Sequence, residues 1–295
     1  MSFTIAQTLD DALTALAAGA RPVAGGSDLV VGARHGKAPL PESIVAIDRL
    51  EALKAVDITD AGASIGALVN HHTIEHHPVL AVTYAALSDG SALVGSPSTR
   101  NVGTLGGNVM NGSPAMDTGS PLVVLGAEVE LQSLRGTRRV AVADLWTGPG
   151  RTSAAPDELC VAVHVPAPVA GSGSAYLRLE YRRAMEIAVV GAAASVTLAA
   201  DGSVAAVRVA LTAVAPTILE VTGLGGGSVA DVAVAARAAA SDQARPISDV
   251  RASDRYRRHT VGVMAQRAVE AAARRAAGTP VPVPVNRALG IGAAS

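Results

Sequence analysis

The spacing of apolar and polar positions predicts a mixture of helices and strands over the first 170 residues. Apolar residues three and four positions apart mark amphipathic helices, and short continuous apolar runs mark buried strands. Helices are expected at 9–18, from Ser27 or Asp28 onwards, at 71–88 with a break at Pro78, and at 121–125. Strands are expected at 21–24, 44–47, 63–66, 127–133, 138–142 and 159–165.

A stretch rich in proline and glycine, residues 166–174, separates this part from the rest and is the best candidate for a linker. Beyond it, strand-like runs at 187–199 and 204–213 flank Asp201-Gly202, a pair typical of hairpin turns. Helices are expected at about 229–241 and 256–277. The pattern predicts a domain over 1–170 with lobes of about 1–59 and 60–170, a second over 171–278, and a Pro/Val-rich tail over 279–295 that wraps a neighbour or frays.

Composition narrows the class of protein. Hydrophobic residues make up 49% of the 295 and charged residues only 17%, which excludes a disordered chain. The net charge of −1 and the scattered arginines argue against nucleic-acid binding. The single cysteine, Cys160, cannot form an internal disulfide or hold an iron–sulfur cluster or a Cys-ligated zinc. Neither a signal peptide nor a membrane span is evident, so a cytoplasmic protein is expected.

The first candidate for chemistry is a glycine pair between a predicted strand and a predicted helix. Glycines at this position let backbone amides approach a phosphate, and the helix N-terminus adds positive potential. The alternative is a plain tight turn with a Ser or Asp cap. The residues concerned are Ala24, Gly25, Gly26, Ser27, Asp28 and Leu29.

The second candidate lies in the segment 95–112, which is too polar for a strand and too glycine-rich for a helix, so a long loop is expected. Such a loop becomes ordered when a ligand fills it, and a pyrophosphate suits the hydroxyl, amide and backbone donors here. Asp117, shortly after it, is suited to accept hydrogen bonds from ribose hydroxyls. An ordered surface loop is the alternative. The candidate residues of the segment are Thr104, Leu105, Gly106, Gly107 and Asn108.

Other motifs for nucleotide binding and hydrolysis are weak or absent. There is no P-loop, and the glycines at 223–227 break the Rossmann pattern at Ser228. No G-x-S-x-G supports a serine hydrolase. Within the cluster His71–His77, residues 72–76 match H-x-x-E-H, a zinc motif, but Pro78 limits any helix and no acidic helix downstream offers a third ligand. A solvated, histidine-rich helix start is therefore favoured.

A segment rich in arginine, residues 176–188, opens the second domain. Its arginines could face an electron-rich ring or a diphosphate, and the alternative is an edge strand with surface arginines.

Taken together, these segments resemble the FAD-binding medium subunit of the molybdenum hydroxylases, the family of xanthine dehydrogenases and aerobic carbon monoxide dehydrogenases. The resemblance covers nearly the whole chain, and the order and spacing of the paired glycines are specific. It implies an α+β fold, with a two-lobed FAD-binding domain of the PCMH type followed by a small αβ domain with a three-stranded sheet. The matching segments are R-P-V-A-G-G-S-D-L at 21–29, R-N-V-G-T-L-G-G-N at 100–108, S-P-A-M-D at 113–117 and R-R-A-M-E-I-A at 182–188.

The resemblance also implies roles for individual residues. Residues 24–29 and 104–108 would form two loops around the FAD pyrophosphate, and Asp117 would meet the ribose region. Leu159 matches an apolar residue that lies against the flavin. Arg178 occupies a position where relatives place a lysine near the isoalloxazine ring, and Glu186 replaces the more usual aspartate.

The resemblance implies that the chain is the FAD-carrying electron-transfer subunit of a multi-subunit molybdenum hydroxylase. Substrate would be oxidised at a molybdenum–molybdopterin cofactor in a large subunit, and two [2Fe–2S] clusters in a small subunit would pass electrons to FAD. FAD would deliver them to an acceptor such as NAD or a quinone. A dimer of heterotrimers, that is a heterohexamer, is expected. The alternatives are a stand-alone FAD-dependent oxidase and a flavin-free structural subunit of the same fold.

Overall fold

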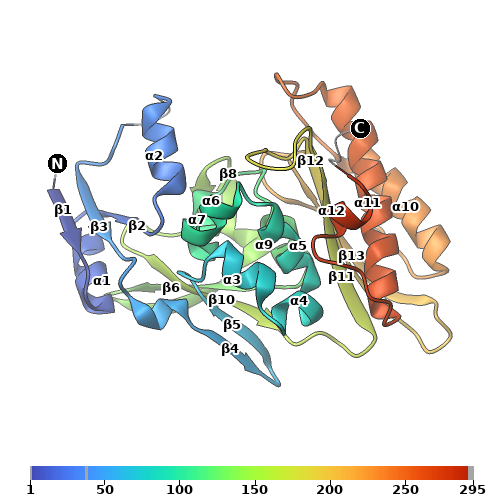
Figure 1. The fold of residues 1–295 in the computed structure, drawn as a ribbon, viewed down its shortest axis with the longest axis horizontal. Coiled ribbons are helices and arrows are strands. Elements are labelled where there is room, and N and C mark those ends of the chain that lie inside the picture. Colours follow the sequence, from blue (N-terminus) through green and yellow to red (C-terminus); the bar gives the residue numbers. More distant parts are fainter. Residues whose placement is uncertain (1, 37–38, 292–295) are drawn as a thin grey trace.

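The computed structural model describes residues 2–36 and 39–291. The chain is laid out along one long axis, with the N-terminal lobe at one end, a second lobe of sheet and helices in the middle, and a C-terminal domain at the other end (Figure 1). None of the helices in the described chain has both the length and the apolar character that crossing a bilayer requires.

The first lobe is a small parallel sheet in the order β1-β3-β2 with two helices. Its elements are β1 Ser2–Ile5, α1 Leu9–Ala17, β2 Arg21–Val23, α2 Ser27–Arg34 and β3 Ser43–Ala46, followed by the 3-10 turn η1 Glu51–Lys54. Helix α1 begins with a capping box, in which the Thr8 hydroxyl accepts from the Asp11 amide and the Asp11 carboxylate accepts from the Thr8 amide. The helices and strands that the pattern predicts for this lobe are present.

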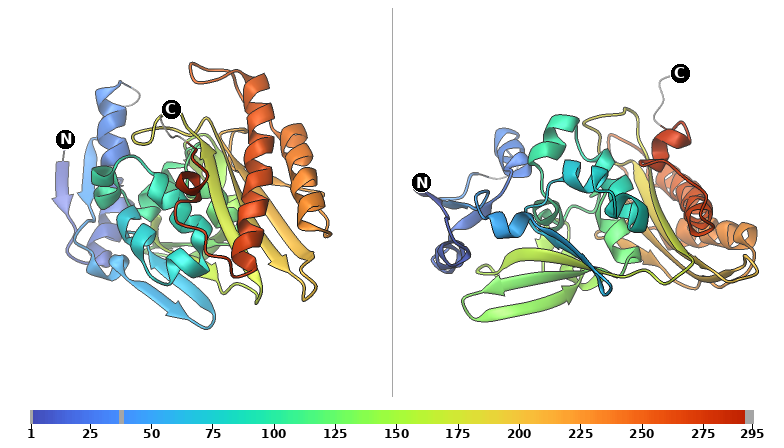
Figure 2. Two further views of the ribbon diagram at one scale, coloured as in Figure 1. Left: turned by 45° about the vertical axis from the view of Figure 1, so that its right-hand side comes forward. Right: turned by 60° about the horizontal axis from the view of Figure 1, so that its bottom comes forward.

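The second lobe is an antiparallel sheet in the order β4-β5-β10-β6-β7, with short helices over one face (Figure 2). The strands are β4 Val56–Thr59, β5 Gly62–Gly66, β6 Glu128–Ser133, β7 Gly136–Ala141 and β10 Leu159–Pro166. The helices are α3 His71–His76, α4 Leu80–Thr83, α5 Ala85–Leu93, α6 Pro97–Val102, α7 Leu105–Asn111, α8 Gly119–Val124 and α9 Val142–Leu145. A small hairpin pairs β8 Trp146–Gly148 with β9 Arg151–Thr152.

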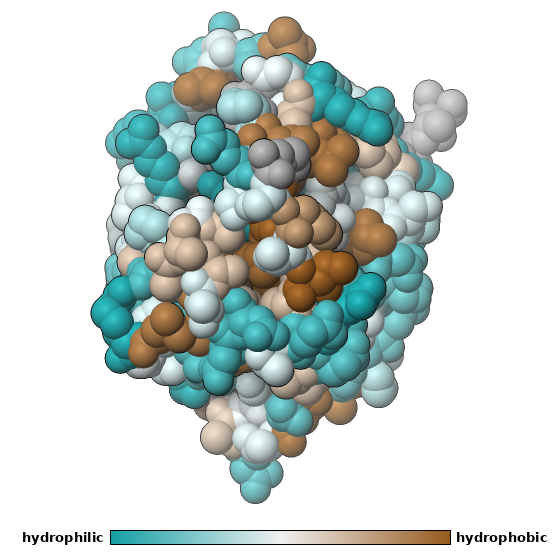
Figure 3. Space-filling model, turned by 90° about the vertical axis from the view of Figure 1, so that its left-hand side faces the viewer, coloured by the Kyte–Doolittle hydropathy of each residue, from teal (hydrophilic) through white to brown (hydrophobic). Residues whose placement is uncertain are grey.

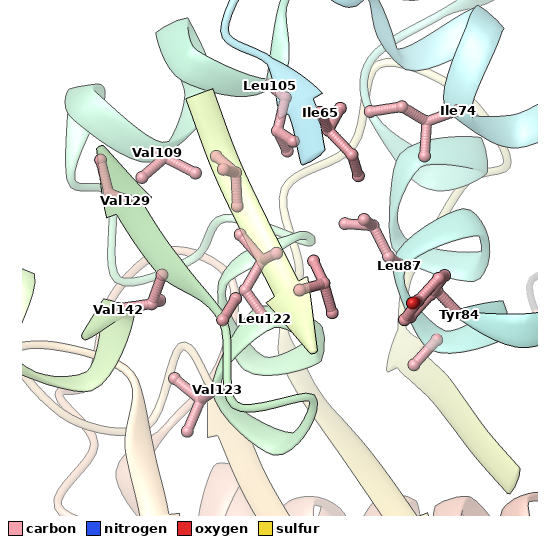
Figure 4. Packing of buried hydrophobic residues seen from close by; sticks show 14 of the residues in the cluster. Ile65, Ile74, Tyr84, Leu87, Leu105, Val109, Leu122, Val123, Val129 and Val142 are labelled. Atoms are coloured by element: carbon pink, nitrogen blue, oxygen red, sulfur yellow. The ribbon is translucent and has the colours of Figure 1, made fainter. Parts of the chain in front are cut away.

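A continuous apolar core lies between this sheet and its helices. Ile65 of β5, Leu105 of α7 and Leu122 of α8 are fully buried and belong to one cluster (Figure 4). Tyr84 is the one aromatic side chain labelled in that view, and the other labelled residues are aliphatic. The whole cluster also contains Trp146 and Tyr176. This packed core fixes the position of α7 against the sheet.

The prediction of a long loop at 95–112 is wrong, because the structure forms helices α6 and α7 there. The polar residues act as helix caps: Ser96 and Thr104 each accept a hydrogen bond from the amide three residues further on, at 3.2 and 3.1 Å. The glycines serve close packing, since a Cβ at Gly106 would lie 2.6 Å from the Cβ of Ala67. The residue types that suggested a loop therefore mark short helix starts.

The C-terminal domain is an antiparallel sheet with two helices against one face. Its elements are β11 Ser172–Leu179, β12 Val190–Leu198, β13 Val204–Thr212, β14 Leu219–Val221, α10 Val229–Gln243 and α11 Asp254–Ala276. The three long strands are the predicted sheet, and the three-residue strand β14 adds a fourth at the edge. The predicted hairpin and both predicted helices are present.

The two domains share a core and several buried polar contacts. Tyr176 and two alanines of the C-terminal sheet belong to the same apolar cluster as the second lobe. Asp89 of α5 is completely buried, and its carboxylate accepts hydrogen bonds from Arg275 at 2.6 and 3.1 Å and from the backbone amides of Tyr176 and Val285 at 3.0 Å. A single carboxylate therefore joins the second lobe, β11, α11 and the tail.

The tail packs against its own domain over the described part. It forms the short helix α12 Val285–Ala288. The Asn286 side chain accepts from the Arg178 amide and donates to the Arg178 carbonyl, both at 2.9 Å, and so satisfies one position on the free edge of β11. Residues 292–295 of the predicted tail lie outside the described residues.

Candidate functional site

Helix α2 begins at a glycine and lacks a capping side chain. Gly26 occupies the N-cap position with a left-handed backbone (φ 67°), and no side-chain hydrogen bond caps the helix. The first amides of a helix need partners, and the helix dipole favours a negative group there. Because the N-cap residue is glycine, no capping side chain lies between a phosphate and these amides.

The two predicted glycine segments lie against each other although they are far apart in the sequence. A Cβ at Gly25 would lie 1.8 Å from the carbonyl oxygen of Val102, which leaves room only for glycine. A Cβ at Gly103 would lie 3.8 Å from the Ser27 Oγ, so the start of α2 and the residue before Thr104 share one small region. The structure thus brings together the segments on which the resemblance rests.

At the start of α7, the backbone amides already have partners. The Leu105 and Gly106 amides donate to carbonyls of residues 69 and 67, both at 2.9 Å. The Gly107 and Asn108 amides donate to the Thr104 hydroxyl oxygen and carbonyl, at 3.1 and 2.9 Å. Asn108 accepts from Thr118 through Oδ1 at 2.6 Å, which leaves its Nδ2 to donate. Donors for a ligand therefore come from the Thr104 hydroxyl and the Asn108 amide group, beside the exposed Gly107.

His71 lies behind the contact between the two segments, a placement that the sequence pattern does not predict. Its amide donates to the Gly103 carbonyl at 3.1 Å, and its ring lies within 3.4 Å of where a Gly103 Cβ would be. Burial, reinforced by the charge of Arg100, lowers the pKa of His71 to about 4. A neutral imidazole therefore supports the glycine segments from inside.

Asp117 and Arg178 meet in a buried polar network at the joint between the domains. Arg178 Nη1 donates to Asp117 Oδ2 and Nε donates to Glu180 Oε2, both at 2.7 Å. The Tyr176 hydroxyl donates to Asp117 Oδ1 at 2.8 Å. Burial alone would lower the pKa of Arg178, but the two carboxylates raise it above its ordinary value, so the guanidinium stays charged. The Arg178 Nη2 is buried and has no hydrogen-bond partner in the described chain.

The network also explains how Asp117 and Asn108 are held relative to each other. Asp117 is followed by Thr118, whose hydroxyl donates to Asn108 of α7. Burial and the neighbouring Asp117 raise the pKa of Tyr176 well above its ordinary value, so its hydroxyl remains a donor to that carboxylate. The alternative of an edge strand with surface arginines is therefore wrong for Arg178, which is fully buried, although β11 is an edge strand.

Leu159 and the arginine-rich loop occupy different surroundings. Leu159 begins β10 and is buried in the apolar cluster that joins the first lobe to the second, against which Ala24 also packs. The loop after Glu180 carries Met185 in a left-handed backbone (φ 52°), and its amide donates to the Gly95 carbonyl at 2.8 Å. The loop is thereby attached to the turn before α6.

Comparison with known proteins decides the family. The model of the FAD binding domain in molybdopterin dehydrogenase matches residues 1–168, and that of the CO dehydrogenase flavoprotein C-terminal domain matches residues 175–272. The chain belongs to the FAD-binding medium subunits of the molybdenum hydroxylases. The chain is therefore an oxidoreductase subunit. The family resemblance inferred from the glycine motifs is confirmed.

Individual relatives are similar along almost the whole medium subunit. The chain is 34% identical over 269 residues to the carbon monoxide dehydrogenase medium chain of Afipia carboxidovorans, covering 90% of this chain and 92% of the relative. It is 30% identical over 286 residues to a putative xanthine dehydrogenase FAD-binding subunit of Escherichia coli (strain K12), covering 94% and 97%. A structure of Cu,Mo-CO dehydrogenase superimposes with a TM-score of 0.88 at 32% identity, covering 93% of this chain and 99% of that chain.

Proposed function

We propose that this medium subunit binds FAD between α2 and α7 and carries electrons from iron–sulfur clusters of a partner subunit to an external acceptor. The observation that carries the proposal is the contact between the uncapped start of α2 and the segment leading into α7. That contact joins a helix N-terminus suited to an anion with side-chain donors on a second helix. Membership of the family supports the identity of the ligand.

The residues present fit the pyrophosphate and ribose of FAD. Residues 24–29 and 104–108 would hold the pyrophosphate, because Gly25 and Gly26 keep the approach clear and the Thr104 hydroxyl and Asn108 Nδ2 can donate. Asp117 would meet the ribose region with the lone pairs that Tyr176 and Arg178 leave unused.

Leu159 and Arg178 are proposed to contribute to the flavin environment. Leu159 belongs to the buried apolar cluster against which Ala24 packs, and the Arg178 Nη2 is a buried donor without a partner in the described chain. When bound, FAD supplies a redox group that exchanges one or two electrons. The chain's own role is to bind FAD through fixed backbone and side-chain dipoles and to exclude water from one side of it. The charged Arg178 and the protonated Tyr176 would lie near the bound cofactor.

The partners proposed are a large molybdenum–molybdopterin subunit and a small subunit with two [2Fe–2S] clusters, assembled as a dimer of heterotrimers. Cys160, the only cysteine of the sequence, is buried, and burial raises its pKa to about 12, so clusters must come from another chain. Large apolar side chains exposed on the first lobe support a surface that another chain covers, and Figure 3 shows apolar patches on that side. The exposed large apolar side chains of the first lobe include Phe3, Val30 and Val31. NAD or a quinone is the proposed acceptor.

The domain division proposed is 1–170, 171–278 and a tail at 279–295, and the cytoplasmic location stays a prediction from the sequence. The test of function is to express the chain with its neighbouring genes and to purify the assembly through a tag on this subunit. We expect stoichiometric FAD in the released cofactor fraction and co-purification of an iron–sulfur and a molybdenum subunit. Absence of flavin from a folded assembly contradicts the proposal.

A further inference from the structure

Helix α3 brings three potential metal ligands together on its surface. His72, Glu75 and His76 each offer one ligand atom, and these atoms lie within 4.8 Å of one another. The two imidazole rings are 4.3 Å apart between centroids, and both histidines are exposed to solvent. The spacing follows from the helix, which places positions 72, 75 and 76 on one face.

The hydrogen bond of His76 selects the tautomer that a metal needs. His76 Nδ1 lies 2.9 Å from the carbonyl oxygen of His72, and because a carbonyl only accepts, Nδ1 carries the proton. The Nε2 of His76 then keeps its lone pair for a ligand. A metal-bound histidine commonly donates a hydrogen bond from its other ring nitrogen to a backbone carbonyl, and this hydrogen bond fixes the tautomer and the ring orientation.

Glu75 is held in place by a cation on the neighbouring helix. Arg100 Nε lies 2.9 Å from Glu75 Oε2, and both side chains are nearly buried. The pair fixes the carboxylate and leaves Oε1 as the second oxygen. A carboxylate paired with arginine is a poor general base, so this arrangement argues against the hydrolytic role that H-x-x-E-H has in zinc proteases.

We propose that His72, Glu75 and His76 bind one divalent cation of the Zn²⁺ class, with water completing the coordination. Two imidazoles and one carboxylate are a donor set that zinc takes in proteins. The ion would cross-link the two turns of α3, whose first residue, His71, is buried against Gly103. The proposal is independent of FAD binding, because none of the three ligands belongs to the segments at 24–29 or 104–108.

The test uses the full-length chain carrying no polyhistidine tag, stripped with EDTA and titrated with ZnCl₂ by isothermal calorimetry. We expect one Zn²⁺ per chain, a higher unfolding temperature with Zn²⁺, and an affinity at least about tenfold lower in His72→Ala and in His76→Ala. Co²⁺ should give the visible absorption of a low-coordinate nitrogen–oxygen site in the wild type and in neither of these two variants.

The matched control is His77→Ala, in the same segment but outside the ligand set. Its Zn²⁺ affinity should equal that of the wild type. His72→Ala and His76→Ala should unfold as cooperatively as the wild type in EDTA, because both histidines are exposed. His77→Ala removes the acceptor of the Leu80 amide at 3.3 Å, so its unfolding is compared with and without Zn²⁺ in the same way. Absence of Zn²⁺ binding by the folded chain overturns the proposal, and so does binding that survives in both His72→Ala and His76→Ala. Loss in His77→Ala overturns the ligand assignment.

Discussion

Arg178 of β11 and Asp117, in the turn before α8, form a buried ion pair across the joint between the two domains, with 2.7 Å between Nη1 and Oδ2. The arginine also pairs with Glu180 at 2.7 Å, so one cation compensates two carboxylates in a region closed to water. Removal of the cation would leave both carboxylates without compensation.

Arg178→Met should therefore destabilise the chain by about 3–5 kcal/mol, the range for one partner lost from a buried pair. The measurement is the urea midpoint followed by far-ultraviolet circular dichroism. The matched control is Arg208→Met on β13, where the ion pair with Glu220 is open to solvent, with side chains 43% and 37% exposed, and about 0–1 kcal/mol is expected. Equal midpoints for the two variants would contradict the role given to Arg178.

Gly25→Ala should abolish FAD retention, because the added Cβ would lie 1.8 Å from the Val102 carbonyl and force the two segments apart. The measurement is the molar ratio of released flavin to purified chain. Gly32→Ala, inside the following helix α2 and with open space around it, is the control and should keep full flavin. It should also gain about 0.5–1 kcal/mol from helix propensity. Full flavin content in Gly25→Ala would show that α2 is not part of the site.

Gly107→Val tests the other side of the site without breaking the fold. Gly107 is exposed, and a Cβ there would meet only the Thr104 Oγ1, at 2.9 Å. A branched side chain would occupy the approach to the side-chain donors of α7, so we expect loss of FAD with an unfolding temperature of the apo form close to that of the wild type. Retained flavin in this variant would place the pyrophosphate elsewhere.

The buried His71 should make the apo form sensitive to acid. The pKa of His71 is lowered to about 4 from an ordinary value of 6.5, so the unfolded chain binds the proton more tightly than the folded chain. The contribution of the neutral His71 to the free energy of unfolding is therefore complete above about pH 6.5. It is lost as the pH falls towards 4, and about 2 kcal/mol is lost at pH 5. Urea midpoints at pH 5 and pH 7.5 should differ less in His71→Gln than in the wild type. An identical pH dependence would show that His71 is accessible to protons in the fold.

Much of the fold follows from the sequence because its elements carry local signals. Helix α1 has its capping box and stop glycine, and the hairpin of β12 and β13 has Asp201-Gly202. The sequence predicts the segment 95–112 wrongly because glycine and polar residues weaken a helix in isolation, whereas Gly106 is required by the distance to Ala67. That requirement exists only once β5 and α7 are packed together.

The two glycine segments of the candidate site were recognisable, but the polar network behind them was not. No local pattern distinguishes a buried arginine from a surface arginine, since the burial of Arg178 depends on Asp117 and Asn286, which are 61 and 108 positions away. The same holds for His71, whose burial follows from the packing of α3 against the segment before α7.

The hydrogen bonds of Asp89 constrain the order in which a newly made chain can reach its final structure. Asp89 leaves the ribosome early, yet Arg275, the only cation paired with it in the described chain, is 186 positions further on. Until α11 has been synthesised, the second lobe contains an acidic group that cannot be buried at low cost. We therefore expect the first two lobes to remain open during translation and to accept their cofactor only after the C-terminal helices have docked.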